Sequence, residues 1–207
     1  MSEPEDDIRR YSAHRFAAGV MVCPSCLVHV PVQTDSCPSC RFTGGDTMAM
    51  FPLALPPLQP LLDAADLWTP RQQGKIRKRI RTAERRFPQI RWSLCSVNAG
   101  AVPNLRLFGF WMLNASPLAA GETAEQRAWT VLLLFNGSDG KVALVPGYGV
   151  ETWVADDEWQ RVLMEMAVPW SRGKRGRALR CFFSAAEESL RAAWKRAKHQ
   201  LKRQSEP

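Results

Sequence analysis

Four cysteines near the amino terminus form two Cys-x-x-Cys pairs, Cys23 with Cys26 and Cys37 with Cys40, and ten residues separate the pairs. Two residues between thiolates allow one tight turn to direct both sulfur atoms at a single ion. Four thiolates complete the tetrahedral coordination of zinc and leave no open position for a substrate, so such a site is structural. The spacing therefore predicts a zinc ribbon over residues 20–45, with Zn²⁺ as its structural cofactor.

The segment between the two cysteine pairs is consistent with a ribbon. Residues 27–32 predict a short strand, and residues 33–36 predict the turn that returns the chain. His29 lies inside the expected strand. Because four sulfur atoms already satisfy the ion, we do not expect this histidine to be a ligand.

Disulfide bonds are the competing explanation for the cysteines. The first seven residues contain four acids and no apolar stretch follows them, so the features of a secretory signal are missing and we expect a cytoplasmic protein. Structural disulfides rarely persist in that reducing compartment.

The longest apolar run, residues 128–135, is far shorter than the roughly 20 residues of a membrane-spanning helix, so no transmembrane segment is expected. Cys95 and Cys181 stand alone, and we expect both to be small buried side chains.

The 28 lysine and arginine residues are concentrated in two segments. Residues 71–91 contain nine of them against one acid, and residues 172–203 contain eleven against two acids, which leaves a net charge of −9 on the rest of the chain. Such segments attract nucleic acid, anionic lipid or an acidic partner, but they are also typical of solvated helix faces. The candidate basic surface comprises Lys75, Lys78, Arg79, Arg86, Lys195 and Lys198.

The chain after the ribbon predicts helices and strands in alternation. Four prolines within residues 51–60 exclude a helix or a central strand there. Thr69 and Gln72 form a capping box that starts a helix, which ends before Pro88. The continuously apolar run over 129–135 is typical of a strand covered on both faces, so we expect it to be the central strand.

Further elements complete the expected architecture. Turn residues over 136–140 join the central strand to a second strand over 141–145 as a hairpin. The remaining expected elements are a strand over 91–97, a short buried helix over 105–114, a helix over 156–166, and a final helix opened by a capping box of Ser184 with Glu187. This order predicts an α/β fold, a small central sheet layered by helices and preceded by the ribbon.

Residues 55–170 also carry a family resemblance. Residues 62–69, 86–92 and 108–114, and the loop over 146–151 with Asp156 and Asp157 after it, occur in an order that resembles the TPM-domain family. The resemblance implies an α/β sandwich with a small central sheet. Members include a plant lumenal protein described as an acid phosphatase, proteins that bind calcium or other divalent ions, and membrane-anchored bacterial proteins of unknown activity. The ribbon and the expected lack of a signal or anchor depart from this pattern.

The resemblance implies a candidate divalent-cation site. Its ligands, carried over from the family, are Asp63 or Asp66 together with Glu151, Asp156 and Asp157. Ca²⁺ or Mg²⁺ would need several oxygen ligands of this kind. The alternative is that Asp156 and Asp157 are ordinary helix-start residues. A phosphatase would also need a phosphate-binding motif, and none occurs in the sequence.

We therefore expect a binding or assembly module with a structural zinc, and not an efficient enzyme. The alternatives are a metal-dependent phosphatase-like hydrolase and a zinc-ribbon protein that binds nucleic acid. The expected partner is an unidentified protein or an acidic molecule. The expected parts are a tail over 1–19, the ribbon over 20–45, a proline-rich linker over 46–60, a TPM-like domain over 61–170 and a basic helical extension over 171–207.

Overall fold

The structure is a computed structural model that describes residues 21–30, 34–51, 54–100 and 104–204. The chain divides into two compact units, residues 1–152 and residues 153–207. The expected tail over 1–19 and residues 31–32 of the expected ribbon strand lie outside the described residues. In the described part of the chain, no helix combines the length and the apolar character needed to cross a bilayer.

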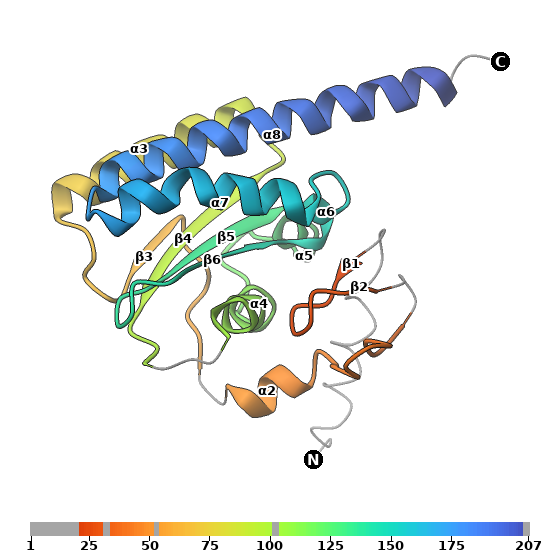
Figure 1. Ribbon diagram of the computed structural model, residues 1–207, viewed down its shortest axis with the longest axis horizontal. Coiled ribbons are helices and arrows are strands. Elements are labelled where there is room, and N and C mark those ends of the chain that lie inside the picture. The colour runs from red at the N-terminus through yellow and green to blue at the C-terminus, as the bar shows by residue number, and fades with distance from the viewer. Residues whose placement is uncertain (1–20, 31–33, 52–53, 101–103, 205–207) are drawn as a thin grey trace. The chain divides into compact units, whose positions relative to one another are not determined.

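A four-stranded sheet forms the centre of the first unit (Figure 1). Its strands lie in the order β3 (Leu61–Asp63), β4 (Arg91–Val97), β5 (Thr130–Asn136) and β6 (Val142–Pro146). The first three strands run parallel, and β5 and β6 form an antiparallel hairpin. The expectation of an α/β fold built on a small sheet with helices beside it is confirmed.

The apolar strand β5 lies inside the sheet, between β4 and β6, and every one of its residues is buried. Its run of branched and aromatic side chains serves both faces, since successive residues of a strand point to opposite sides. The hairpin turn closes through hydrogen bonds from Asn136 N–H to the Lys141 carbonyl and from Gly140 N–H to the Asn136 carbonyl. The predicted interior strand and hairpin are thus confirmed.

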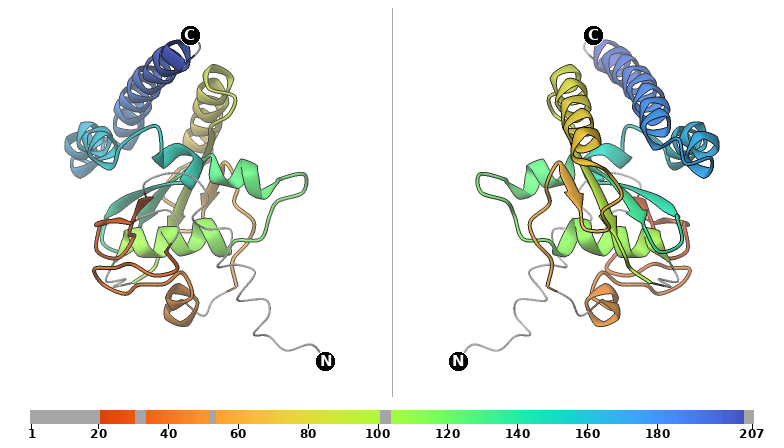
Figure 2. Two further views of the ribbon diagram at one scale, coloured as in Figure 1. Left: turned by 90° about the vertical axis from the view of Figure 1, so that its right-hand side faces the viewer. Right: turned by 90° about the vertical axis from the view of Figure 1, so that its left-hand side faces the viewer.

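Helix α4 (Leu105–Ala115) covers one face of the sheet, where its side chains share a core with Leu132, Leu134 and Val145. Gly109 lies at the closest approach, because a Cβ atom there would be only 2.9 Å from the Val145 side chain. Helix α3 (Pro70–Arg86) lies on the other side of the sheet from α4 (Figure 2). Burial of each large aliphatic side chain in these layers contributes on the order of 2 kcal/mol to folding.

The predicted start and end of α3 are both confirmed. Thr69 Oγ1 accepts from the Gln72 N–H, and the Gln72 side chain accepts from the Thr69 N–H, which is the expected capping box. The helix ends at Arg86, just before Phe87 and Pro88. Its apolar residues Ile76, Ile80 and Ala83 are buried against the sheet domain.

Five short elements escaped sequence analysis. They are β1 (Met21–Val22), α2 (Asp46–Met50), β3, α5 (Ala124–Ala128) and α6 (Tyr148–Glu151). None exceeds five residues, which is too short for a helical or strand period to be recognised. As a result, part of the expected linker is helical, and the expected loop after Pro146 contains one helical turn.

The ribbon contains a two-stranded antiparallel sheet, β1 (Met21–Val22) with β2 (His29–Val30). The expected strand over 27–32 was too long at its start. Leu27 adopts a φ of 65°, so it belongs to the turn that follows Cys26 and not to the strand. The turn expected over 33–36 agrees with the bends at residues 35 and 36.

The second unit is a helical hairpin of α7 (Asp156–Ser171) and α8 (Arg175–Gln204). Gly173 at a φ of 69° ends α7, and the N–H of Lys174 reaches back to the Pro169 carbonyl at 2.9 Å. This arrangement is a Schellman cap. The expected start of the last helix at Ser184 was wrong, because the chain resumes a helix directly after this cap and Ser184 lies inside α8.

An ion pair joins the two helices of the hairpin. The Arg196 guanidinium of α8 donates to both carboxylate oxygens of Glu158 in α7, at 2.9 and 3.2 Å, and to the Trp153 carbonyl. Trp194, an aromatic residue of α8, is 56% exposed. Helix α7 continues to Ser171, beyond its expected end at residue 166, and includes Pro169.

Candidate metal centre

The four cysteines of the ribbon are placed to hold one metal ion. All four sulfur atoms lie within 4.8 Å of one another. The Sγ atoms of Cys23 and Cys40 are 3.7 Å apart, and those of Cys26 and Cys37 are 3.6 Å apart. Four sulfur atoms at about 2.3 Å from a tetrahedral zinc ion would be about 3.8 Å from one another. The arrangement therefore fits a zinc-sized ion held by thiolates alone.

Two turns of the same geometry present the sulfur atoms. In the first, the Cys23 N–H donates to the Val28 carbonyl, and the Leu27 N–H donates back to the Cys23 carbonyl, each at 2.9 Å. In the second, Cys37 pairs in the same way with Phe42 and Arg41, at 2.9 and 2.8 Å.

The residue directly after each Cys-x-x-Cys pair has a positive φ, 65° for Leu27 and 60° for Arg41. Residues other than glycine rarely adopt this region, and doing so costs on the order of 1 kcal/mol. Its repetition at equivalent positions shows that both turns are shaped to bring two sulfur atoms to one point.

The surroundings give the thiols different proton affinities. Cys23 and Cys37 are buried within the ribbon, whereas Cys40 is exposed. Burial raises the pKa of Cys23 to about 12. The backbone N–H of Cys40, more than any other group, lowers the pKa of Cys37 to about 7. A metal ion must displace protons from these thiols, so its binding depends on pH.

His29 does not belong to the group that could hold an ion. It lies in β2 with an exposed side chain, whereas its neighbour Val30 is buried beside the cysteines. This placement agrees with the expectation that His29 is not a ligand.

The ribbon contacts the sheet domain within the first unit. Phe42, which follows the second cysteine pair, packs against the ribbon core and also against the core under α4. Its ring meets that of Phe110 edge-on, with centroids 6.1 Å apart. Val22 and Pro24 complete a cavity of about 10 Å³ beside α4 and α6, which is room for a single water. The two cysteine-bearing turns are thus supported by aromatic packing from α4.

Asp63, one of the predicted cation ligands, ends β3 with its carboxylate occupied by protein donors. One oxygen accepts from the Leu67 N–H at 2.8 Å and from the Ser96 hydroxyl. The other accepts from the Trp68 N–H at 3.1 Å and from the Gln73 side chain at 3.0 Å. Burial alone would raise the pKa of Asp63, but these hydrogen bonds outweigh it and hold the pKa below its ordinary value. In this arrangement the carboxylate stabilises the segment that connects β3 to α3, because it accepts hydrogen bonds from that segment and from the first turn of the helix.

The other predicted acids come from three further segments of the chain. Among the described residues, the four cysteines are the one group of three or more potential ligands close enough to share an ion. Asp66 is exposed and follows the turn after β3, and Glu151 ends α6 beside the small cavity. Asp156 and Asp157 begin α7, in the second compact unit. The calcium or magnesium site has no support from these placements and stays a prediction.

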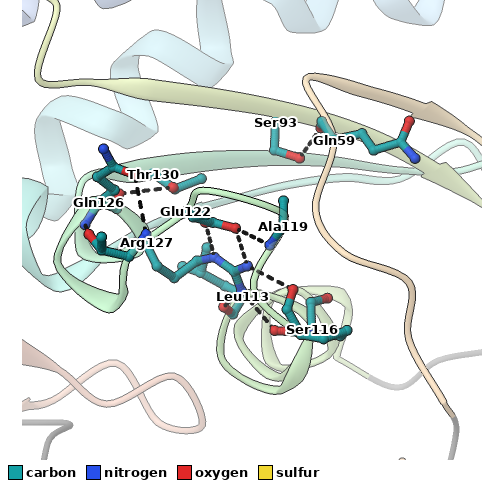
Figure 3. A network of polar contacts seen from close by, with 11 residues as sticks. Gln59, Ser93, Leu113, Ser116, Ala119, Glu122, Gln126, Arg127 and Thr130 are labelled. Atoms are coloured by element: carbon teal, nitrogen blue, oxygen red, sulfur yellow. Dashed lines mark hydrogen bonds and ion pairs between the residues drawn. The ribbon is translucent and has the colours of Figure 1, made fainter.

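A buried ion pair that the sequence did not reveal holds the end of α4 (Figure 3). Arg127, 8% exposed, lies in α5 and binds both carboxylate oxygens of Glu122, at 2.6 and 2.8 Å. Its guanidinium also donates to the carbonyls of Leu113, Ser116 and Pro117 at 3.0 to 3.1 Å. The Leu113 carbonyl belongs to the last turn of α4, where helix carbonyls have no partner within the helix, and Ser116 and Pro117 directly follow the helix.

The same ion pair shifts the titration of Glu122. Burial alone would raise the pKa of its carboxyl group, but the hydrogen bond and charge of Arg127, with a further contribution from Arg91, hold the pKa below its ordinary value. The role of the network is therefore structural, since all five N–H donors of the arginine are engaged in hydrogen bonds to Glu122 and to backbone carbonyls.

The predicted basic residues fall on two separate helices. Lys75, Lys78 and Arg86 are exposed on α3, and Arg79 is half-buried there. Lys195 and Lys198 are exposed on α8, where the Lys198 ammonium lies 5.4 Å from the centre of the Trp194 ring. The two helices belong to different compact units.

Comparison with known proteins identifies no family. No family model matches the chain, and no curated protein matches it. Among solved structures, the chain is similar to the N-terminal domain of a protein from P. gingivalis, determined by NMR in solution. The two share 17% identity at a TM-score of 0.47, and the match covers 71% of this chain and 88% of that one.

Proposed function

We propose that this chain is a cytoplasmic zinc-ribbon protein with a TPM-like α/β domain, and that it acts as a non-catalytic binding or assembly module. The observation that carries the proposal is the group of four cysteines on two matched turns. The order of the segments in the sequence supports the TPM-like domain.

The chemistry of the ligands favours zinc. Thiolate sulfur in a tetrahedral arrangement suits Zn²⁺, whereas Ca²⁺ and Mg²⁺ require oxygen ligands. Four protein ligands also leave no position for a substrate or an activated water. A metal ion bound by all four cysteines would therefore stabilise the ribbon and would not catalyse a reaction.

The small size of the ribbon makes the metal necessary for its fold. Among the described residues of the ribbon, the core consists of three buried residues, Cys23, Val30 and Cys37, with Cys26 and Phe42 packed beside them. So small a core contributes too little apolar burial to fold alone, so the free energy of metal binding becomes free energy of folding.

The loop over 146–151, which carries part of the family resemblance, has no space for side chains at its two glycines. A Cβ atom on Gly147 would lie 2.4 Å from the Ala128 carbonyl oxygen, and one on Gly149 would lie 2.9 Å from the Trp129 ring. The two glycines therefore allow the loop after β6 to pack against the start of β5. This packing supports a TPM-like domain in which the Gly-Tyr-Gly motif has a structural role.

Native mass spectrometry tests the proposal. Protein purified without chelator is expected to carry one zinc, and Cys37→Ser is expected to carry none. Cys181→Ser is the matched control, because Cys181 lies in α8 outside the group, and it is expected to keep the zinc. Metal-free wild-type protein after zinc supply, or zinc retained by Cys37→Ser, would contradict the proposal. Spectra recorded with added calcium or magnesium test the predicted divalent site in the same samples.

A further inference from the structure

The exposed side of α3 is a continuous cationic surface. Seven lysine and arginine residues of this helix are exposed, and they are here called the α3 basic face: Arg71, Lys75, Arg77, Lys78, Arg81, Arg85 and Arg86. At 100° per residue, these positions fall within an arc of about 180°. The single acid of the helix, Glu84, lies outside this arc and accepts a hydrogen bond from the backbone of Trp92.

The α3 basic face was not needed to form the helix. The apolar residues Ile76, Ile80 and Ala83 and the capping box at Thr69 already provide for its folding. The first turn of α3 contains Arg71 and no acid, which is unfavourable next to the positive end of the helix dipole. Like charges at i and i+4, such as Arg77, Arg81 and Arg85, also repel one another. The face therefore opposes helix stability, and a bound polyanion would relieve both costs.

The charge density of the face selects among polyanions. Seven cations over 16 residues of helix give one positive charge per roughly 3–4 Å of its axis. Each strand of duplex DNA carries one negative charge per about 3.4 Å, so the two densities match. Five of the seven residues are arginine, whose planar guanidinium binds phosphate oxygens in pairs.

The composition of the face excludes two other anionic partners. A membrane-surface helix inserts an apolar side into the lipid, whereas the apolar side of α3 is buried in the protein core. Binding of single strands relies on exposed aromatic rings that stack on bases, and the α3 basic face contains none.

We propose that the α3 basic face binds the phosphate backbone of duplex DNA without reading its sequence. The proposal rests on the binding role proposed above and names the surface and the partner. With about 22 Å between Arg71 and Arg86, the face can follow one strand over roughly six phosphates. Contacts to phosphate alone make the affinity insensitive to sequence and steeply dependent on salt.

Fluorescence anisotropy with a labelled 20-base-pair duplex tests the proposal. The test variant combines Lys78→Gln, Arg81→Gln and Arg85→Gln, three exposed residues at the centre of the face. Glutamine keeps the helix propensity, so α3 is expected to remain folded. We expect at least tenfold weaker binding than wild type at 100 mM salt. We also expect the slope of log affinity against log salt to become less negative by about 3, because each lost phosphate contact contributes about 0.9.

A control with the same change in net charge separates this surface from general electrostatic attraction. It combines Arg172→Gln, Lys174→Gln and Arg177→Gln, exposed residues of the second unit. The control is expected to bind DNA within twofold of wild type. Equal loss in both triple variants, or binding that does not weaken as salt rises, would overturn the proposal.

The same preparations distinguish the remaining outcomes. Wild-type protein that binds vesicles containing anionic lipid, but not the duplex, would also overturn the proposal. Zinc content is measured on each sample, so a failure of DNA binding in fully zinc-loaded protein refutes the α3 basic face alone. Loss of zinc in the wild type would instead refute the proposed ribbon.

Discussion

Replacement of Arg127 by methionine is expected to cost about 4 kcal/mol of folding free energy. Methionine keeps the length and most of the apolar contact of the side chain, but it removes all five hydrogen bonds of the guanidinium. The Glu122 carboxylate then remains partly buried without its ion-pair partner. Breaking a buried pair from one side costs roughly 3–5 kcal/mol, and three carbonyls at the end of α4 also lose a donor.

Urea denaturation followed by tryptophan fluorescence measures this cost. A loss of 4 kcal/mol in a unit of about 150 residues also lowers its melting temperature by roughly 8–16 °C. Arg127→Lys is expected to lie between wild type and Arg127→Met, because lysine restores the charge but not the paired geometry. The combined variant Arg127→Met with Glu122→Gln is expected to recover part of the loss, since no uncompensated charge is then buried.

The reasoning would be refuted by a cost below 1 kcal/mol for Arg127→Met. It would be refuted equally by a double variant that loses the sum of the two single changes, because residues that form one ion pair are not independent.

Three further predictions follow from local geometry. The lowered pKa of Glu122 adds stability that is present above its unfolded value of about 4.3 and is lost as pH falls through the lower folded value. The difference in stability between wild type and Arg127→Met should therefore become smaller at low pH, where only the carbonyl contacts of Arg127 remain, and a constant gap down to pH 2 would argue against the pair. Gly147→Ala should lose more than about 2 kcal/mol in urea, because its Cβ meets the Ala128 carbonyl, whereas Gly74→Ala, with open space around it, should gain up to about 1 kcal/mol. Arg41→Gly should leave zinc affinity equal or higher in a chelator competition and Arg41→Val should lower it, since only glycine adopts a φ of 60° without cost.

The parts of the fold that sequence analysis predicted are those with a strong local signal. The capping box at Thr69 and the buried run of β5 each carry their own period or terminal residues, and both were placed correctly. The cysteine spacing likewise predicted that four sulfur atoms would meet. In each case, the information lies within a short stretch of the chain.

The parts that were missed depend on contacts between distant segments. β3 has only three residues and exists because β4 pairs with it. Ser184 and Glu187 fit the pattern of a capping box, but they do not start a helix. The break between α7 and α8 lies earlier, at Gly173, so α8 begins at Arg175 and continues through both residues. A signal for the cap at Gly173 was available, since a glycine directly after a helix commonly marks its end.

The candidate site residues show the same division. Asp63 was selected through a family resemblance, whereas the structure engages its carboxylate with donors that include Ser96, 33 residues away. Arg127 was overlooked because nothing in its immediate sequence distinguishes it from a surface arginine. Its importance arises from the carbonyls of α4, which only the folded chain brings to it.

X-ray absorption at the zinc edge tests the central claim most directly. The account predicts a single shell of four sulfur atoms at about 2.3 Å in the purified protein. It also predicts that Cys37→Ser loses this spectrum, whereas Cys181→Ser keeps it. A first shell that contains nitrogen or oxygen, or protein that is folded over residues 20–45 without zinc, would contradict the account.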